Sequence, residues 1–342
     1  MTRRERGPSV PAADAVVQST IERIRKRFGS GAAICPGRDI PRSQVRGVIP
    51  TGVDVVDRWV LGCGGLPLGR LVELYSEAGI CKTSFGWTAL GACQRAGGIA
   101  VYCDSEQSYD PARASTFGVD QDRLVLLQPL TLEEALEEME ATLEGLDFPG
   151  PVLVVWDSLA EAPYKGDLTG NYGKESADNR AKLIGRWCRV MSALAVQKQA
   201  CILVINQARQ KRGIAFGNST TTPGGDALKF FASLRVQLFG GKAVKDKRGL
   251  HIGKAVTFFA AKTRFSQPFR KAKVRLDFEN GWDNLWSTIN HAKDLELIPA
   301  ASKYKPETYA EAVKALAWEG AASVAELAST EGVEDADGLD EE

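Results

Sequence analysis

The chain has 342 residues, of which 44% are hydrophobic and 25% are charged, a composition typical of one large globular domain with smaller attachments. The 43 basic and 43 acidic residues give a formal net charge of zero, which excludes a chain that is basic or acidic as a whole. Seven cysteines without a C-x-x-C pair argue against a disulfide framework or a zinc site and favour a reducing compartment. The apolar stretches are no longer than strands, so we expect no secretion signal and no membrane span.

The charges are distributed unevenly along the sequence. Residues 206–275 contain 16 lysines and arginines but only two acids, Asp226 and Asp246, whereas residues 331–342 contain seven acids and no base. A basic region in a neutral chain is typical of a surface that binds a polyanion, and an acidic tail can compete with that polyanion. A solvated basic surface with a disordered, solubilising tail explains the same charges, so the pattern alone leaves both interpretations open.

An amphipathic helix is predicted near the N-terminus, over residues 12–28. Its apolar side chains recur at helical spacing, at Val16, Val17, Ile21, Ile24 and Phe28. Glycines and prolines then mark a linker as far as about residue 48. We therefore expect residues 1–48 to form an oligomerisation helix and linker that pack elsewhere, for example on another subunit.

Residues 49–285 carry the pattern of an α/β core. The strand-length apolar runs are residues 71–75, 99–103, 152–156 and 200–205, and the helical patterns between them are residues 83–96, 132–145 and 177–197. Strands that are apolar on both faces and alternate with helices form a mostly parallel sheet flanked by helices. The sequence therefore predicts the α/β class for this core.

The pattern changes in the last hundred residues. Residues 235–278 contain several strand-like runs with expected hairpin turns at Gly240–Gly241 and Lys247–Gly249, which predicts an antiparallel extension of the sheet. Residues 286–330 predict a small C-terminal helical region, and residues 331–342 a disordered acidic tail.

The segment between the first core strand and its helix has the context of a Walker A phosphate loop. In that motif, G-x-x-x-x-G-K-[ST], backbone N–H groups face the phosphates, the lysine reaches the β and γ oxygens and the hydroxyl holds Mg²⁺. This chain retains Lys82 and Thr83, but Ser76 and Cys81 replace the two glycines. Each replacement adds strain or bulk of about 1 kcal/mol or more. The motif alone therefore leaves nucleotide binding and a vestigial loop as alternatives.

Polar side chains follow three of the predicted parallel strands. Asp157 ends one strand, where an aspartate contacts Mg²⁺ in Walker B motifs or, alternatively, caps the next segment. Glu106 follows another strand, where a carboxylate can polarise the attacking water, and Gln207 follows a third, next to the γ-phosphate. Because the carboxyl ends of parallel strands meet at the edge where open α/β sheets bind ligands, we expect these three side chains to converge.

Residues 207–225 form a long polar segment with little that could enter a core. Basic side chains suit phosphates, an aromatic ring can wedge between bases, and glycines permit close approach of the backbone. These residues are Arg209, Lys211, Arg212, Phe216, Asn218, Gly224 and Gly225. An ordinary disordered surface loop is the alternative.

Five stretches make residues 13–298 resemble the RecA-type recombinases of bacteria and phages. They are IPTGVDVVDRWVLGCGGLPLGRLVELY (49–75), DSEQSYDP (104–111), LVVWDS (153–158), INQARQKRGIAFGNSTTTPGGDALKFFAS (205–233) and AKTRFSQPFRKA (261–272). The fourth looks like the second DNA-binding loop of that family at most positions. The resemblance implies a RecA-like P-loop ATPase core with an N-terminal docking helix.

The resemblance also implies roles for individual residues. The implied catalytic residues are Glu106, Gln207, Lys262 and Arg264, of which the last two reach the ATP of the neighbouring subunit. The implied nucleotide-binding residues are Gly79, Ile80, Cys81, Lys82, Thr83, Ser84, Asp110 and Arg113, with Thr83 and Asp157 holding Mg²⁺. The implied DNA-binding residues are Lys182, Gly185, Arg189, Arg209, Lys211, Arg212, Phe216, Asn218, Gly224 and Gly225, and Phe230 matches a subunit interface.

The function implied is an ATP-dependent recombinase that forms filaments on single-stranded DNA, pairs it with homologous double-stranded DNA and exchanges strands in recombination and repair. The implied cofactors are ATP and Mg²⁺, and the implied place is the cytoplasm of a bacterial or phage-infected cell, in association with the nucleoid. The replaced glycines put turnover in question, and the short region after Ile298 puts capture of duplex DNA in question. The alternative is an accessory subunit that keeps the fold and interface but has lost ATP turnover.

Overall fold

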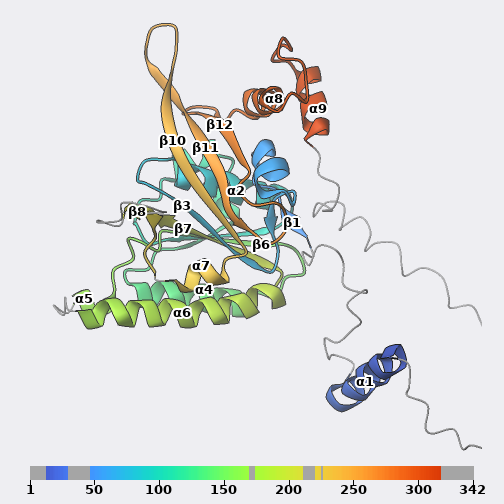
Figure 1. The fold of residues 1–342 in the computed structure, drawn as a ribbon. Helices are drawn as coiled ribbons and strands as arrows, with labels where there is room; N and C mark the ends of the chain where they lie inside the picture. Colours follow the sequence, from blue (N-terminus) through green and yellow to red (C-terminus); the bar gives the residue numbers. More distant parts are fainter. Residues whose placement is uncertain (1–12, 30–46, 169–173, 211–219, 225, 317–342) are drawn as a thin grey trace, which may run out of the picture. The chain divides into compact units, whose positions relative to one another are not determined.

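The computed structural model describes residues 13–29, 47–168, 174–210, 220–224 and 226–316 (Figure 1). The chain divides into two units, Met1–Gln44 and Val45–Glu342. In the first unit the predicted helix is confirmed as α1 (Ala13–Phe28). Apolar side chains of α1 are exposed, among them Val16, Val17 and Phe28.

The second unit is built on one large mixed sheet. Within the described residues its nine strands run in the order β13 (Gly281–Trp282), β12 (Lys271–Asp277), β11 (His251–Thr263), β10 (Leu234–Lys245), β3 (Arg70–Ser76), β7 (Ala200–Gln207), β6 (Val152–Asp157), β4 (Ile99–Asp104) and β5 (Leu124–Leu127). The six strands from β10 to β5 are parallel, and β11, β12 and β13 continue the sheet antiparallel. The predicted α/β core with an antiparallel extension is thus confirmed.

Helices cover both faces of the sheet, because its central strands are apolar on both sides. One apolar cluster joins the sheet to α2 (Lys82–Arg95), to the single π-helical turn η2 (Val56–Leu61) and to α8 (Asn284–Asp294). The other joins the opposite face to α4 (Leu132–Gly145), α6 (Lys174–Gln197) and α7 (Ala227–Phe231), which Figure 1 shows together on one side.

The remaining elements are short. They are β1 (Val48–Ile49), β2 (Leu66–Pro67), α3 (Pro111–Thr116), η3 (Gln121–Arg123), α5 (Lys165–Leu168), β8 (Arg209–Gln210), β9 (Thr220–Thr221) and α9 (Pro306–Ala315). No described helix combines the length and the apolar content that crossing a bilayer requires.

The hairpin of β10 and β11 corrects one sequence-based expectation. The expected turn at Gly240–Gly241 is wrong, because β10 continues through both residues to Lys245. Their positive φ angles (93° and 95°) accompany a shift in register against β11, so the two glycines form a β-bulge. The turn expected at Lys247–Gly249 is confirmed, since Asp246 N–H donates to the Leu250 carbonyl across it.

The C-terminal helices are bound to the core through polar contacts. Asn284, the first residue of α8, accepts from Asp54 N–H and donates to the Gly52 carbonyl at 2.8 Å. The Tyr309 hydroxyl of α9 donates to the Asp54 carboxylate. The helical prediction is confirmed as far as residue 316, and residues 317–342, including the predicted acidic tail, lie outside the described residues.

A buried ion pair joins the parallel part of the sheet to its extension. Glu73 of β3 is fully buried and accepts from Arg235 Nε of β10 and from Asn206 Nδ2 of β7, the latter at 3.0 Å. The Arg235 guanidinium also lies over the Tyr75 ring, 4.7 Å from its centroid. A buried carboxylate that loses such a partner is left uncompensated in a medium of low dielectric constant.

Replacing Arg235 should therefore destabilise the fold. We expect Arg235→Met to lower the free energy of unfolding by about 3 kcal/mol, measured by denaturant titration, because Glu73 loses its counter-charge. The control is Arg248→Met at the exposed hairpin turn, which should change stability by no more than about 0.5 kcal/mol. Equal effects of the two substitutions would contradict this role of the ion pair.

Candidate nucleotide and DNA-binding site

The predicted phosphate loop connects β3 to the first turn of α2. Ser76 ends β3 and is buried, whereas the following residues as far as Gly79 are exposed. Gly79 and Cys81 both have left-handed backbone conformations, with φ of 74° and 53°. A residue with a Cβ is disfavoured there by roughly 1–2 kcal/mol, which explains why the motif has glycine at the position of Cys81. The loop adopts this conformation although Cys81 carries the cost of a left-handed backbone.

Lys82 points back into its own loop. Its Nζ donates to the Ser76 carbonyl at 3.3 Å, to Ser76 Oγ at 3.0 Å and to the Glu77 carbonyl at 3.0 Å. Burial lowers the pKa of Lys82, and the negative charges of Asp157 and Glu106 partly oppose that shift. Ser84, the second residue after Lys82, is buried in the same first turn of α2.

The two residues implied for Mg²⁺ lie in contact. Thr83 Oγ1 donates to Asp157 Oδ2 at 2.6 Å, and the Tyr102 hydroxyl donates to the same oxygen at 3.0 Å. Burial raises the pKa of Asp157 to about 6, although the hydrogen bond from Thr83 opposes this. A bound cation would stabilise this buried carboxylate, and a hydroxyl next to a carboxylate is the kind of oxygen donor set that Mg²⁺ prefers. The residues present therefore fit Mg²⁺.

Asp104 is a residue that the sequence reasoning missed. It ends β4 directly beside Asp157 in the register of β4 and β6, and it is fully buried. Its Oδ2 accepts from Tyr109 N–H at 2.9 Å, but its Oδ1 has no hydrogen-bond partner among the described residues. This unpaired buried oxygen adds a further carboxylate at the strand end next to Asp157. The position of Asp104 at a strand end was the signal available in the sequence.

The predicted convergence of strand-end side chains is present in the structure. Glu106 follows β4, is exposed, and accepts from Ser158 Oγ at 2.6 Å, so it lies beside the end of β6. Gln207 pairs with Ser76 in the register of β7 and β3, which places it next to the phosphate loop. The structure thus brings Glu106, Asp157 and Gln207 to one edge of the sheet.

Two further predicted nucleotide contacts lie at α3. Asp110 is the N-cap of α3 and accepts from Arg113 N–H at 3.0 Å, and both side chains are exposed. Burial raises the pKa of the Cys81 thiol, whereas the positive charges of Lys254, Arg113 and Lys82 act to lower it. Arg113 therefore belongs to the electrostatic surroundings of the phosphate loop.

Lys254 of β11 also lies beside the phosphate loop, and the sequence reasoning missed it. Its Nζ donates to the Gly79 carbonyl at 2.8 Å. The bulge at Gly241 approaches the loop as well, because a Cβ built on Gly241 would lie 3.7 Å from Ile80 Cδ1. The β10–β11 hairpin thus supports the loop, and no spacing in the sequence relates residue 254 to residue 79.

Lys262 and Arg264 lie far from this chain's own phosphate loop. Lys262 lies eight positions after Lys254 in β11, which at a rise of about 3.3 Å per residue is a distance of roughly 25 Å along the strand. Lys262 Nζ donates to the Phe230 carbonyl at 3.0 Å, and Arg264 Nη2 donates to the same oxygen at 3.2 Å. Phe230 is 71% exposed and borders a cavity of about 280 Å³ that Arg264 also lines. The three residues form one surface, at a distance from the strand-end cluster.

The predicted DNA-binding residues divide into three groups. On α6 the side chains of Lys182 and Arg189 are exposed, whereas Gly185 is buried against α7, where a Cβ would lie 3.7 Å from the Ala227 Cβ. Arg209 lies in β8, and Gly224 is buried with φ of 96°, a conformation that favours glycine. The others lie outside the described residues: Lys211, Arg212, Phe216, Asn218 and Gly225.

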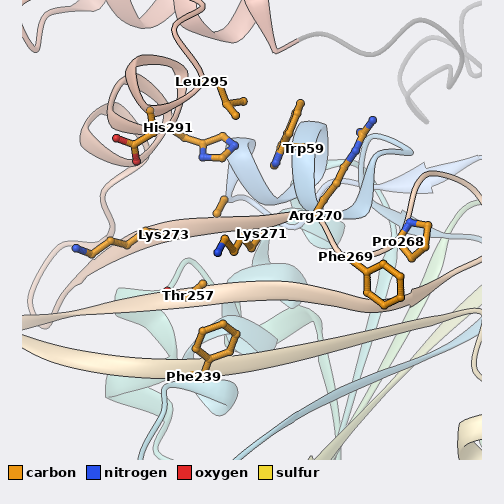
Figure 2. A pocket seen from close by; sticks show the side chains of 12 residues that line it. Trp59, Phe239, Thr257, Pro268, Phe269, Arg270, Lys271, Lys273, His291 and Leu295 are labelled. Carbon is orange, nitrogen blue, oxygen red and sulfur yellow. The ribbon is translucent and has the colours of Figure 1, made fainter. Parts of the chain in front are cut away.

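A further cavity is lined by none of these residues (Figure 2). It has a volume of about 540 Å³ and lies between α8, η2 and the outer side of the sheet extension. The Arg270 guanidinium lies 4.6 Å from the centre of the Trp59 ring, and His291 packs against the same ring at 5.3 Å. Burial lowers the pKa of His291 to about 4, so this side chain is neutral at pH 7 and contributes packing.

Comparison with known proteins gives a consistent result. The model of the RecA N-terminal domain matches residues 15–283. Protein RecA of Bacteroides thetaiotaomicron is 34% identical over 288 residues, which are 84% of this chain and 85% of that protein. Protein RecA of Thermus thermophilus is 34% identical over 290 residues, 84% of this chain and 83% of that protein.

The chain belongs to the RecA family. It is accordingly a recombinase of the type that catalyses DNA strand exchange in recombination and repair, as the sequence resemblance implied, and the alternative of an accessory subunit is not favoured.

The contact of Lys254 with the phosphate loop leads to a testable expectation. Lys254→Ala should weaken binding of ATP roughly threefold to tenfold, because the Gly79 carbonyl loses its donor and the loop loses a nearby positive charge. Titration calorimetry with ATP in the presence of Mg²⁺ measures the dissociation constant of ATP. Lys273→Ala is the control, since Lys273 is an exposed lysine of β12 in the same extension. Unchanged affinity in Lys254→Ala would assign Lys254 no part in the nucleotide site.

Proposed function

We propose that this RecA-family chain is a DNA-dependent ATPase that binds ATP and Mg²⁺ at the β3–α2 loop and forms a helical filament on single-stranded DNA. The observation that carries the proposal is the convergence of Lys82, Thr83 and Asp157 with Glu106 and Gln207 at one edge of the sheet. RecA-family proteins in general use ATP and Mg²⁺.

Each residue of the cluster has a role that suits its position. Thr83 and Asp157 would hold Mg²⁺ through their oxygens, and Lys82 would turn from its loop toward the β and γ oxygens. ATP, when bound, supplies the γ-phosphoryl group that is transferred to water. Glu106 would orient that water and accept its proton, and Gln207 would hydrogen-bond the γ oxygens at the start of the segment that leads to the DNA-binding residues. Asp110 and Arg113 would contact the adenine.

The nucleotide site is completed by a second subunit in this proposal. Lys262 is about 25 Å along β11 from the loop of its own chain, and Arg264 directly follows the end of that strand, so a nucleotide there is beyond their reach. Burial and the neighbouring charges of Arg264 and Arg235 lower the pKa of Lys262, which indicates a surface that an anion would stabilise. A head-to-tail contact brings this surface, with exposed Phe230, onto the phosphate loop of the neighbour and propagates into a helix.

DNA contacts follow from the charge distribution. We assign the phosphates of single-stranded DNA to Arg209, Lys211 and Arg212 together with Lys182 and Arg189 of α6, and base pairing with a homologous duplex supplies sequence recognition. We place the protein in the cytoplasm of a bacterial or phage-infected cell, at the nucleoid. The six cysteines of the described residues are free thiols, which supports a reducing compartment.

The central test is an ATPase assay with and without single-stranded DNA. We expect DNA to stimulate hydrolysis, and we expect Lys82→Ala to reduce the stimulated rate roughly a hundredfold, because Lys82 neutralises charge on the transferred group. Lys303→Ala, at an exposed lysine between α8 and α9, is the control. A parent protein that binds DNA but shows no hydrolysis above that of Lys82→Ala would refute the ATPase proposal.

Mixing two inactive variants tests the shared site. A subunit with Lys262→Ala and Arg264→Ala keeps its own loop, and a Lys82→Ala subunit keeps the surface that reaches its neighbour. In a random equimolar filament about a quarter of the sites receive both intact halves, so the mixture should regain about a quarter of the parental ATPase rate. If Lys262 and Arg264 act only within their own chain, the mixture stays as inactive as either variant alone.

A further inference from the structure

We propose that Ser76 is a positioning residue that holds Lys82 in a withdrawn position through its hydroxyl group and thereby sets the affinity for ATP. The inference rests on the proposed nucleotide site and adds to it a role for the side chain at the first glycine position. The proposed Ser76–Lys82 contact distinguishes this chain from a loop with the complete motif, in which glycine offers a carbonyl but no hydroxyl.

The Lys82 ammonium group is saturated by its own loop. It has three N–H donors, and three acceptors lie within hydrogen-bond distance: the Ser76 carbonyl, Ser76 Oγ and the Glu77 carbonyl. Two of the three acceptors belong to Ser76. Lys82 is 8% exposed and Ser76 1% exposed, so water does not readily replace these partners.

The hydroxyl of Ser76 is oriented to accept. It donates its own hydrogen to the Glu77 carbonyl at 2.7 Å, which leaves its lone pairs for the Lys82 ammonium at 3.0 Å. Hydrogen bonds in which one partner is charged are stronger than neutral ones, so the Ser76–Lys82 contact adds substantially to the two carbonyl contacts. Ser76 therefore stabilises the withdrawn lysine more than glycine would.

This stabilisation acts against the bound state. To reach the phosphates, Lys82 has to leave the Ser76 hydroxyl, and a nucleotide binds more weakly when the competent arrangement is only fractionally populated. Removing the hydroxyl while keeping the Cβ should therefore lower the stability of the nucleotide-free protein and raise its affinity for ATP. An effect of opposite sign on stability and on affinity is not expected of a residue that only supports the fold.

The test compares Ser76→Ala with a matched control, Ser287→Ala. Ser287 is also fully buried, and its Oγ accepts from the backbone N–H of Arg275 at 3.0 Å and donates to the Asp283 carbonyl at 2.6 Å, so it loses one accepted and one donated hydrogen bond at a site in α8 without a charged partner. The measurements are the dissociation constants of ATP and ADP with Mg²⁺, the KM and kcat of DNA-stimulated hydrolysis, and the melting temperature without nucleotide.

We expect Ser76→Ala to bind ATP roughly threefold to tenfold more tightly, with a lower KM and a kcat within about twofold of the parent. Its melting temperature without nucleotide should fall by about 2–4 °C. Ser287→Ala should show a similar fall in melting temperature and an unchanged dissociation constant. Ser76→Gly carries the glycine of the Walker A motif and should also bind ATP more tightly than the parent. If Ser76→Ala does not fold, Ser76→Gly takes its place in the test.

The outcomes separate the inference from the proposed function. Suppose that the parent binds ATP and that Ser76→Ala binds it equally well or more weakly. The Ser76 hydroxyl then does not favour the withdrawn position of Lys82, so the inference is wrong while the proposed nucleotide site stands. If the parent, Ser76→Ala and Ser76→Gly all fail to bind ATP at millimolar concentration, the proposed nucleotide site fails and the inference fails with it.

Discussion

The buried carboxylate of Glu73 constrains how the sheet extension is placed against the phosphate loop. It has no contact with water, so it has to be neutralised by Arg235 of β10 and hydrogen-bonded by Asn206 of β7. This requirement fixes the register of β10 against β3 and, through β10, the register of β11. Asn206 Nδ2 also donates to the Pro223 carbonyl at 3.0 Å, so the same group holds the end of the polar segment that follows β7.

Both cationic groups of β11 depend on that register. Lys254 approaches the phosphate loop of its own chain, and Lys262 lies on the distant surface with Phe230, because the two residues stand far apart on one continuous strand. A sequence shows that both are lysines in a basic region, but it does not show which residue of β10 each opposes. For this reason the contact of Lys254 with Gly79 was not predictable, whereas the strand-end residues Glu106, Asp157 and Gln207 were.

The sequence predicted elements where burial leaves a clear pattern. The central strands β3, β4, β6 and β7 are apolar on both faces, and their prediction was right to within one or two residues. The edge strand β5 was missed, since it is short and its Val125 and Leu126 are partly exposed. Positive φ at Gly240–Gly241 suits a turn and a bulge equally, and only the pairing with β11 decides between them.

The position of Cys81 in the phosphate loop has a chemical consequence. Other thiols of the core are protected, since burial raises the pKa of Cys63, Cys93 and Cys188 to about 12 and keeps them protonated at neutral pH. Cys81 is only half-buried; burial raises the pKa of its thiol as well, but the positive charges of Lys254, Arg113 and Lys82 oppose that rise. Among the described cysteines it is therefore the one that an alkylating reagent reaches most readily in the native protein. Its rate of modification reports directly on whether the phosphate loop is open or covered, without any engineered label.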